Sequence, residues 1–246
     1  MVGNARFMVL QAVCWGMVAL ASAQTPAPEP VWTGSAGAGL ALTGGNSDTA
    51  NYSLSLDLKR DPKTRNIMKF TGVYLRGSQN KETTVDRLSL DFRDDYKLDE
   101  RTFVFGEFSY VRDPFKAIDY LMNPQGGIGY KLVATDRLAL AVTGGLGVAW
   151  EKDPDLDVAT SGTVNGGQTL SYKLSESAAI TQSVAALWKM DDFGDSLYHF
   201  AVGLSSALTK RSELKIDLID DFRSQTPGPE IKKNDYALIA SLLFKF

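Results

Sequence analysis

The sequence predicts an all-β fold: an antiparallel transmembrane β-barrel of about twelve strands, with short periplasmic turns and longer extracellular loops. Three observations lead to this prediction. Apolar residues recur at every second position in about twelve segments, aromatic residues gather near the ends of those segments, and the connections between segments alternate in length. A period of two is the pattern of a strand, and the other two features are typical of outer-membrane barrels.

Alternation is clearest in five segments, 86–92, 136–150, 197–208, 212–222 and 234–246. In 197–208, for example, Tyr198, Phe200 and Val202 share one face and His199 lies on the other. A soluble sandwich also alternates, so this pattern alone does not decide the fold. The other face repeatedly carries charged or small polar residues, which favours a barrel with an apolar exterior in lipid and a polar lumen.

Aromatic residues near the segment ends predict two girdles at the membrane interfaces. Trp32, Tyr96 and Phe246 are expected at one level. The other level is expected to hold Tyr52, Tyr74, Tyr110, Trp150, Trp188, Tyr198, Phe222 and Tyr236.

The connections favour the same fold because short and long ones alternate. The short ones are 61–66, 98–101, 134–136, 175–177 and 208–212; the long ones are 77–84, 112–124, 151–166 and 224–233, with 44–49 and 190–195 as exceptions. Short turns on one side and long loops on the other predict a barrel whose two termini are both periplasmic. An even number of strands lets the sheet close and leaves no unpaired edge in lipid.

The chain is divided into a signal peptide at 1–23, a short Pro-rich spacer at 24–30 and the barrel at 31–246. Arg6, an apolar stretch and the "ASA" at 21–23 predict export by the Sec pathway, with cleavage near Ala23-Gln24. The single cysteine, Cys14, is removed with this segment. The chain has 26 Lys+Arg against 29 Asp+Glu, so no basic field indicates a nucleic-acid partner.

Glycines at 34, 37 and 39 have the composition of a phosphate-binding loop but not its context. Such a loop needs a following helix, whereas 52–58 alternates apolar and polar residues as a strand does. We interpret these glycines as positions in the first strand that admit side chains from across the lumen or relieve the curvature of the sheet.

The sequence resembles the salt-induced outer-membrane-protein family, which is otherwise catalogued as a domain of unknown function. The matching residues are Trp32, Gly34, Gly37, Gly39, Leu40, Leu42, Thr43, Gly45, Asn46, Ser47 and Thr49. The resemblance implies an outer-membrane location in a Gram-negative bacterium and a link to salt stress. It brings no catalytic motif. The terminal Phe246 matches the aromatic C-terminus that such barrels present to their assembly machinery.

Candidate chemistry outside a pore is sparse. His199 is the only histidine, and its expected lumenal position argues against a lipid-facing serine–histidine pair, so it is interpreted as lumen lining. Asp153, Asp155 and Asp157 have calcium-loop spacing, but Val158 and Val164 stand where Gly and Glu are needed. No catalytic, cofactor-binding or metal-binding residue is therefore predicted.

These acids, together with Asp191, Asp192 and Asp195, form a predicted acidic rim that could bridge lipopolysaccharide phosphates through divalent ions. The expected partners are thus outer-membrane lipid, lipopolysaccharide and the assembly machinery. The oligomeric state is left open.

Charged residues on the polar face are the candidate lumen-facing residues. They are Asp57, Lys59, Arg87, Asp91, Arg93, Glu107, Lys131, Lys173, Lys189, His199, Lys215 and Asp217. Both signs are represented, so no strong ion selectivity is predicted. Two interpretations stay open: the residues line a narrow water path, or they pair across the lumen and plug it.

The leading functional hypothesis is a non-enzymatic outer-membrane protein that forms a small pore or stabilises the envelope under osmotic stress. One alternative is a hydrolase acting at the rim. Another is a surface receptor that binds through the loops 112–124 and 151–166.

Overall fold

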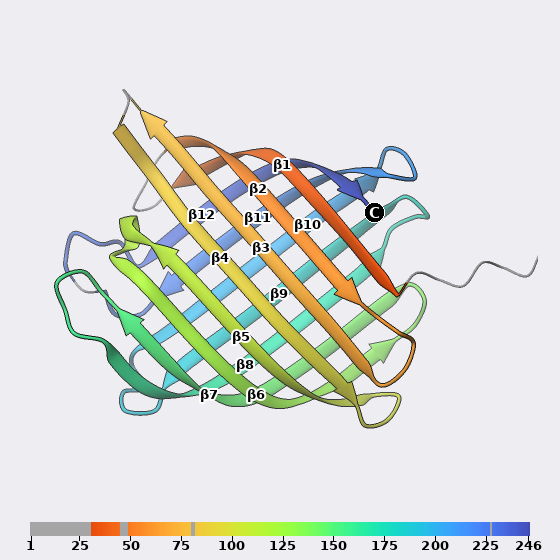
Figure 1. The fold of residues 1–246 in the computed structure, drawn as a ribbon, viewed down its shortest axis with the longest axis horizontal. Helices are drawn as coiled ribbons and strands as arrows, with labels where there is room; N and C mark the ends of the chain where they lie inside the picture. Colours follow the sequence, from red (N-terminus) through yellow and green to blue (C-terminus); the bar gives the residue numbers. More distant parts are fainter. Residues whose placement is uncertain (1–30, 45–48, 80–81, 227) are drawn as a thin grey trace, which may run out of the picture. The chain divides into compact units, whose positions relative to one another are not determined.

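The computed structural model describes residues 31–44, 49–79, 82–226 and 228–246. They form a closed barrel of twelve antiparallel strands (Figure 1). The strands are β1 (Trp32–Gly44), β2 (Thr49–Arg60), β3 (Asn66–Gln79), β4 (Glu82–Lys97), β5 (Thr102–Asp113), β6 (Ile118–Ala134), β7 (Leu138–Lys152), β8 (Ala159–Lys173), β9 (Ala178–Lys189), β10 (Ser196–Ala207), β11 (Ser212–Arg223) and β12 (Asn234–Lys245). The predicted fold class and strand number are confirmed.

Each strand pairs with its neighbours in sequence, and β1 pairs with β12 to complete the ring. Gly34 and Phe246 exchange two backbone hydrogen bonds of 3.0 Å at this junction. The ladders shift register at Gly77/Ser78, between Val111 and Asp113, and between Lys131 and Val133.

Two ends of the barrel are distinguished below by their connections. The terminal end carries residue 31, Phe246 and the turns 61–65, 98–101, 135–137, 174–177 and 208–211. The loop end carries the connections 45–48, 80–81, 114–117, 153–158, 190–195 and 224–233.

The longest connections lie at the loop end, but three predicted loops are wrong in extent. Most of 77–84, 112–124 and 151–166 is strand, because β3 ends at Gln79 and β4 begins at Glu82, β6 begins at Ile118, and β8 begins at Ala159. Polar residues such as Thr163 and Asn165 resemble loop residues, yet both are buried here. In this barrel the interior face is polar, so a polar segment can still be a strand.

Alternation places apolar side chains on the outside of the ring. Leu40 and Trp150 are exposed, whereas their odd-numbered neighbours Ala41 and Ala149 are buried. The exposed aromatic residues include Trp32 and Phe246 at the terminal end and Tyr198 and Phe222 towards the loop end. This surface is the opposite of that of a soluble protein and suits contact with lipid.

Apolar packing inside the barrel is limited. The largest apolar cluster is Ala41, Leu75, Val85, Ala237 and Ile239, contributed by β1, β3, β4 and β12. Most of the other buried residues are polar, so hydrogen bonds and ion pairs fill much of the interior. Among the described residues, no helix is long and apolar enough to cross a bilayer.

The predicted signal peptide (1–23), the spacer (24–30) and part of the first turn (45–48) lie outside the described residues.

Candidate functional site

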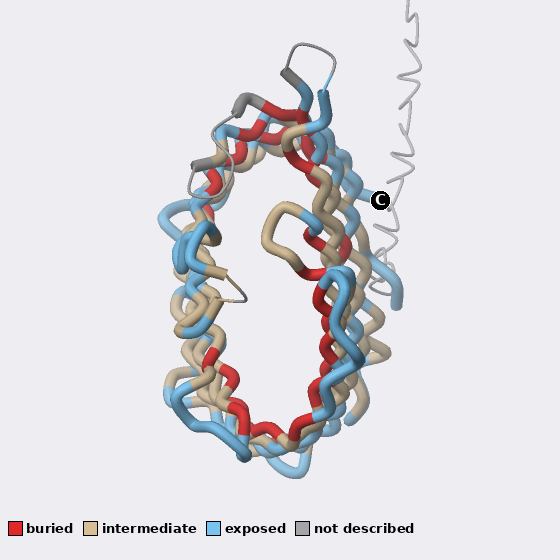
Figure 2. Tube along the Cα trace, turned by 90° about the vertical axis from the view of Figure 1, so that its left-hand side faces the viewer, coloured by how far each residue is buried: buried red, intermediate tan, exposed pale blue. Residues whose placement is uncertain are grey.

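The interior of the barrel is crossed by the connection between β5 and β6. This connection contains a single turn of 3-10 helix, η1 (Pro114–Lys116). Lys116 Nζ lies 3.2 Å from Asp235 Oδ2 and 3.7 Å from Asp221 Oδ2, on β12 and β11. Since β11 is six strands from β5 around the ring, these contacts must pass through the interior. Figure 2, which looks along the barrel, shows one loop of chain inside the ring of strands.

The local sequence explains the single helical turn, although not its direction. Pro114 lacks an N–H and has a fixed φ, so it suits the first position of a helical turn. Ala117 then adopts the left-handed region at φ 56, and its N–H donates to the Pro114 carbonyl at 3.2 Å. A left-handed residue that is not glycine is unfavourable by about 1–2 kcal/mol, so surrounding contacts must hold it. The ion pairs of Lys116 are contacts of this kind.

Asp221 is the centre of this constriction. Its carboxylate pairs with Arg87 from β4 and Lys116 from η1, and it hydrogen-bonds His199 Nδ1 from β10 at 2.7 Å. Three separate elements are therefore tied to one carboxylate of β11. His199 has an orienting carboxylate, as in a catalytic triad, but no serine among the described residues hydrogen-bonds to it.

A second charged cluster lies at the loop end of β7, β9 and β11. Lys189 Nζ contacts Glu151 Oε2 and Asp195 Oδ2, both at 2.6 Å, and Arg223 Nη2 contacts Glu151 Oε1 at 2.5 Å. Asp153 lies 3.6 Å from Arg223. Burial, and then the neighbouring Glu151 carboxylate, raise the pKa of Asp153, which lies in the β7–β8 connection. This cluster fills one side of the loop end.

A third cluster joins β3, β4, β5 and β6. Arg93 binds Asp95 at 2.7 Å and Glu107 at 2.5 Å, and Gln125 donates to Glu107 at 3.0 Å. The Arg93 guanidinium lies 4.0 Å from the centroid of the Phe105 ring, a cation–π contact. These contacts fix Arg93 against the wall of the barrel.

The remaining predicted residues lie nearer the terminal end or along the wall. Lys215 pairs with Asp217 at 3.1 Å, and Lys131 donates to the Glu100 carbonyl at 3.2 Å. Asp57 and Lys59 line a cavity at the terminal end. Asp91 lies within electrostatic range of Glu107, and Lys173 is the last residue of β8.

The interior holds cavities of different size. A cavity of about 820 Å³ lies where β12, β1, β2 and β3 reach the terminal end. Another of about 430 Å³ is lined by β6 to β11, including Lys131, Lys215 and Asp217. The cavity beside η1 is smaller, about 40 Å³. Of these three cavities, the one at the terminal end is thus the largest and the one beside η1 the smallest.

Reasoning from sequence alone missed the residues of the constriction on β11, β12 and η1. Asp221 and Asp235 are odd-numbered members of alternating segments, so their parity could have identified them. Lys116 gave no such signal because its segment was expected to be an extracellular loop. The described residues hold no group of three or more His, Cys, Asp or Glu side chains arranged to bind a metal ion.

Comparisons with known proteins agree with this fold. A family model described as "Protein of unknown function, DUF481" matches residues 36–246. The NanC porin is similar with a TM-score of 0.60 and 12% identity, covering 86% of this chain and 100% of that one. The COG4313 outer membrane channel from Pseudomonas putida F1 is similar with a TM-score of 0.53 and 15% identity, covering 88% and 96%. No curated protein matches the sequence.

Proposed function

We propose that this chain, which belongs to the family described as "Protein of unknown function, DUF481", is a non-enzymatic outer-membrane pore for small hydrophilic solutes. One observation carries the proposal: a closed twelve-stranded barrel has a polar interior that holds cavities and is entered by η1. Water and ions need polar groups along their path, and a segment folded into the lumen limits the size of what passes.

The constriction at η1 predicts a narrow pore and not a wide one. The ion pairs of Lys189 lie at the loop end, and Lys116 reaches through the interior to Asp221 and Asp235. Charged side chains of both signs lie on opposite walls there, so we expect weak selectivity between anions and cations. We expect small conductance because η1 and its ion pairs occupy part of the lumen.

Single-channel conductance of the refolded barrel in a planar bilayer tests this function. We expect small steps that grow with salt concentration, and larger steps for Lys116→Met, because the methionine cannot bind Asp221 and Asp235. Arg65→Met is the matched control: it removes one charge from an exposed turn, and its steps should equal those of the wild type. A silent bilayer from protein that is folded, as judged by its heat-modifiable gel mobility, would overturn the pore.

The resemblance to the salt-induced family supports a role during osmotic stress. We propose that the barrel resides in the outer membrane, is recognised there through Phe246, and either conducts solutes or stabilises the envelope at high salt. A deletion strain complemented with wild type or Lys116→Met, grown over a range of sodium chloride concentrations, tests this role. Equal growth of the deletion and wild-type strains at every concentration would count against it.

A further inference from the structure

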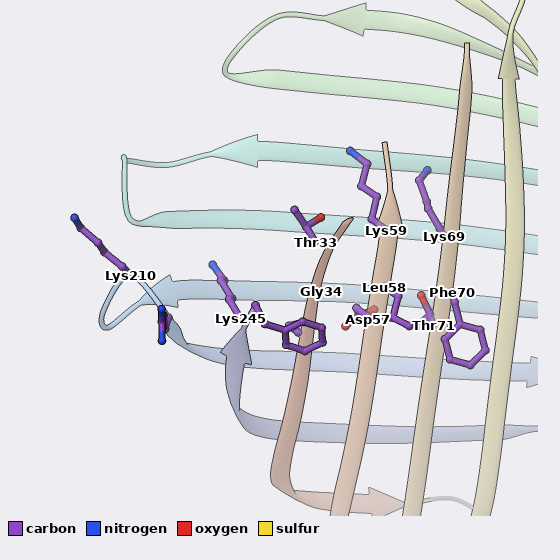
Figure 3. A pocket seen from close by; sticks show the side chains of 13 residues that line it. Thr33, Gly34, Asp57, Leu58, Lys59, Lys69, Phe70, Thr71, Lys210 and Lys245 are labelled. Atoms are coloured by element: carbon purple, nitrogen blue, oxygen red, sulfur yellow. The ribbon is translucent and has the colours of Figure 1, made fainter. Parts of the chain in front are cut away.

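The cavity at the terminal end has a strongly cationic lining. Its charged residues are the cations Lys59, Lys69, Lys210, Arg211 and Lys245 and the single carboxylate Asp57. In Figure 3, Lys59 and Lys69 extend from neighbouring strands in the same direction, while Lys245 projects from β12 and Lys210 from the β10–β11 turn. The remaining lining consists mainly of small polar or apolar residues, so the ammonium groups border open space.

Strand register brings like charges into direct opposition at this cavity. Lys59 on β2 is the partner of Lys69 on β3, and Lys69 is in turn the partner of Arg93 on β4. Three cations therefore stand side by side across three adjacent strands, on the interior face. Directly opposed like charges destabilise a sheet, so this row lowers stability where alternating signs would raise it. Positions that depart from the preference for opposite charges on neighbouring strands are often functional positions.

Nearby carboxylates compensate the row only in part. Lys59 lies 3.2 Å from Asp61, but Asp61 is also shared with Lys63 at 3.8 Å. Lys69 shares Asp95 with Arg93. The side chains of Lys59 and Lys69 are 46% and 47% exposed, so these pairs are weak and a competing anion can replace them.

Lys210 and Arg211 add further positive charge at the rim. They lie in the β10–β11 turn, beside the end of β12, and neither forms an ion pair within the described part of the chain. Lys245 is paired with Glu213. The cavity thus combines a fixed row of cations on the wall with unpaired cations on a turn.

We propose that this cavity is a binding site for polyanionic solutes, molecules that carry several phosphate or carboxylate groups. A ligand with several negative groups can neutralise neighbouring cations of the row together, whereas a monovalent anion neutralises one. The ligand enters from the terminal end, because the cavity lies there, beside the β10–β11 turn and Phe246. Lys59 and Lys69 are the residues that bind it directly.

Calorimetric titration of the folded barrel with sodium tripolyphosphate, in an uncharged detergent at low salt, tests the site. We expect saturable binding to the wild type, weakened at least ten-fold in Lys59→Glu/Lys69→Glu and by raised salt. Opposed glutamates repel one another as opposed lysines do, so heat-modifiable mobility checks that this variant folds, and Lys59→Gln/Lys69→Gln, which removes the repulsion, replaces it if it does not. Lys232→Glu/Lys233→Glu, with the same change in charge at the loop end, should bind like the wild type.

Three results would overturn the site: no binding to the wild type, equal loss in both double variants, or unchanged binding in Lys59→Glu/Lys69→Glu. Sodium acetate in place of tripolyphosphate should give no saturable heat, and equal binding of the two would also contradict the proposal. The titration needs no conducting barrel. If the bilayer shows no conductance steps while tripolyphosphate still binds, the pore function is contradicted and the binding site is supported.

Discussion

Replacing Asp221 by asparagine should destabilise the barrel more than any single change to its cationic partners. The carboxylate accepts hydrogen bonds from Arg87 and His199 and forms an ion pair with Lys116, and the three partners belong to three different elements. Asparagine keeps the size of the side chain but removes its charge. The three partners then face a neutral amide.

The burial of the ion pair between Asp221 and Arg87 sets the expected loss of stability. The side chains of Arg87 and Asp221 are only 18% and 16% exposed, and removing one partner of a buried ion pair costs about 3–5 kcal/mol. Asp235 still binds Lys116, so the lower limit, about 3 kcal/mol, applies here. This corresponds to a roughly hundred-fold change in the unfolding equilibrium. Arg87→Met should cost less, about 1–2 kcal/mol, since Asp221 keeps two partners.

Urea unfolding of the refolded barrel in lipid vesicles, followed by tryptophan fluorescence, measures these differences. Asp157→Asn, an identical change in the exposed β7–β8 connection, is the control and should leave the free energy of unfolding unchanged. If Asp221→Asn were as stable as this control, the ion pairs through the interior would not hold η1, and the constriction argument would be wrong.

Three other predictions concern separate parts of the structure and are tested by the same unfolding assay. Asp153→Asn should stabilise the barrel at pH 7, because burial raises the pKa of Asp153 and the folded state therefore disfavours its charge; the gain should vanish as the pH falls below the ordinary value of 3.8. Gly127→Ala should cost about 1–3 kcal/mol because its methyl group meets the Gly144 carbonyl, whereas Gly144→Ala has nothing within 4 Å and should be neutral. Trp188→Phe should cost about 1 kcal/mol, since the indole N–H donates to the Tyr198 hydroxyl at 3.0 Å. Equal stability of the two alanine variants would contradict the second of these predictions.

The barrel itself was predictable because its constraint is local. An apolar exterior and a polar interior impose a period of two on the strands, and this period can be read from neighbouring residues without any knowledge of their distant partners. The segment 197–208 illustrates this: the exposed Tyr198 and Phe200 and the Asp221-bound His199 follow directly from their parity.

Two kinds of feature could not be predicted. The polar start of β8 was assigned to a loop, and Pro124, which argues against a strand, lies within β6 paired with Phe108. Ion pairs between distant strands depend on the complete register; Arg87 and Asp221 are 134 residues apart. Lys116 reaches β12 only because the β5–β6 connection turns inward, and no pattern in the sequence predicts this direction.

The pairing of β1 with β12 has a consequence for how the chain assembles. Eleven of the twelve strand pairings join neighbours in sequence and can form as successive hairpins, whereas the last brings Gly34 to Phe246 across nearly the whole described chain. Contacts between such distant residues form slowly because a very long loop must close first. Until that step, β1 and β12 each present a row of unpaired backbone N–H and C=O groups that can pair with another chain. The step that closes the ring is therefore also the step that protects the sheet from edge-to-edge aggregation.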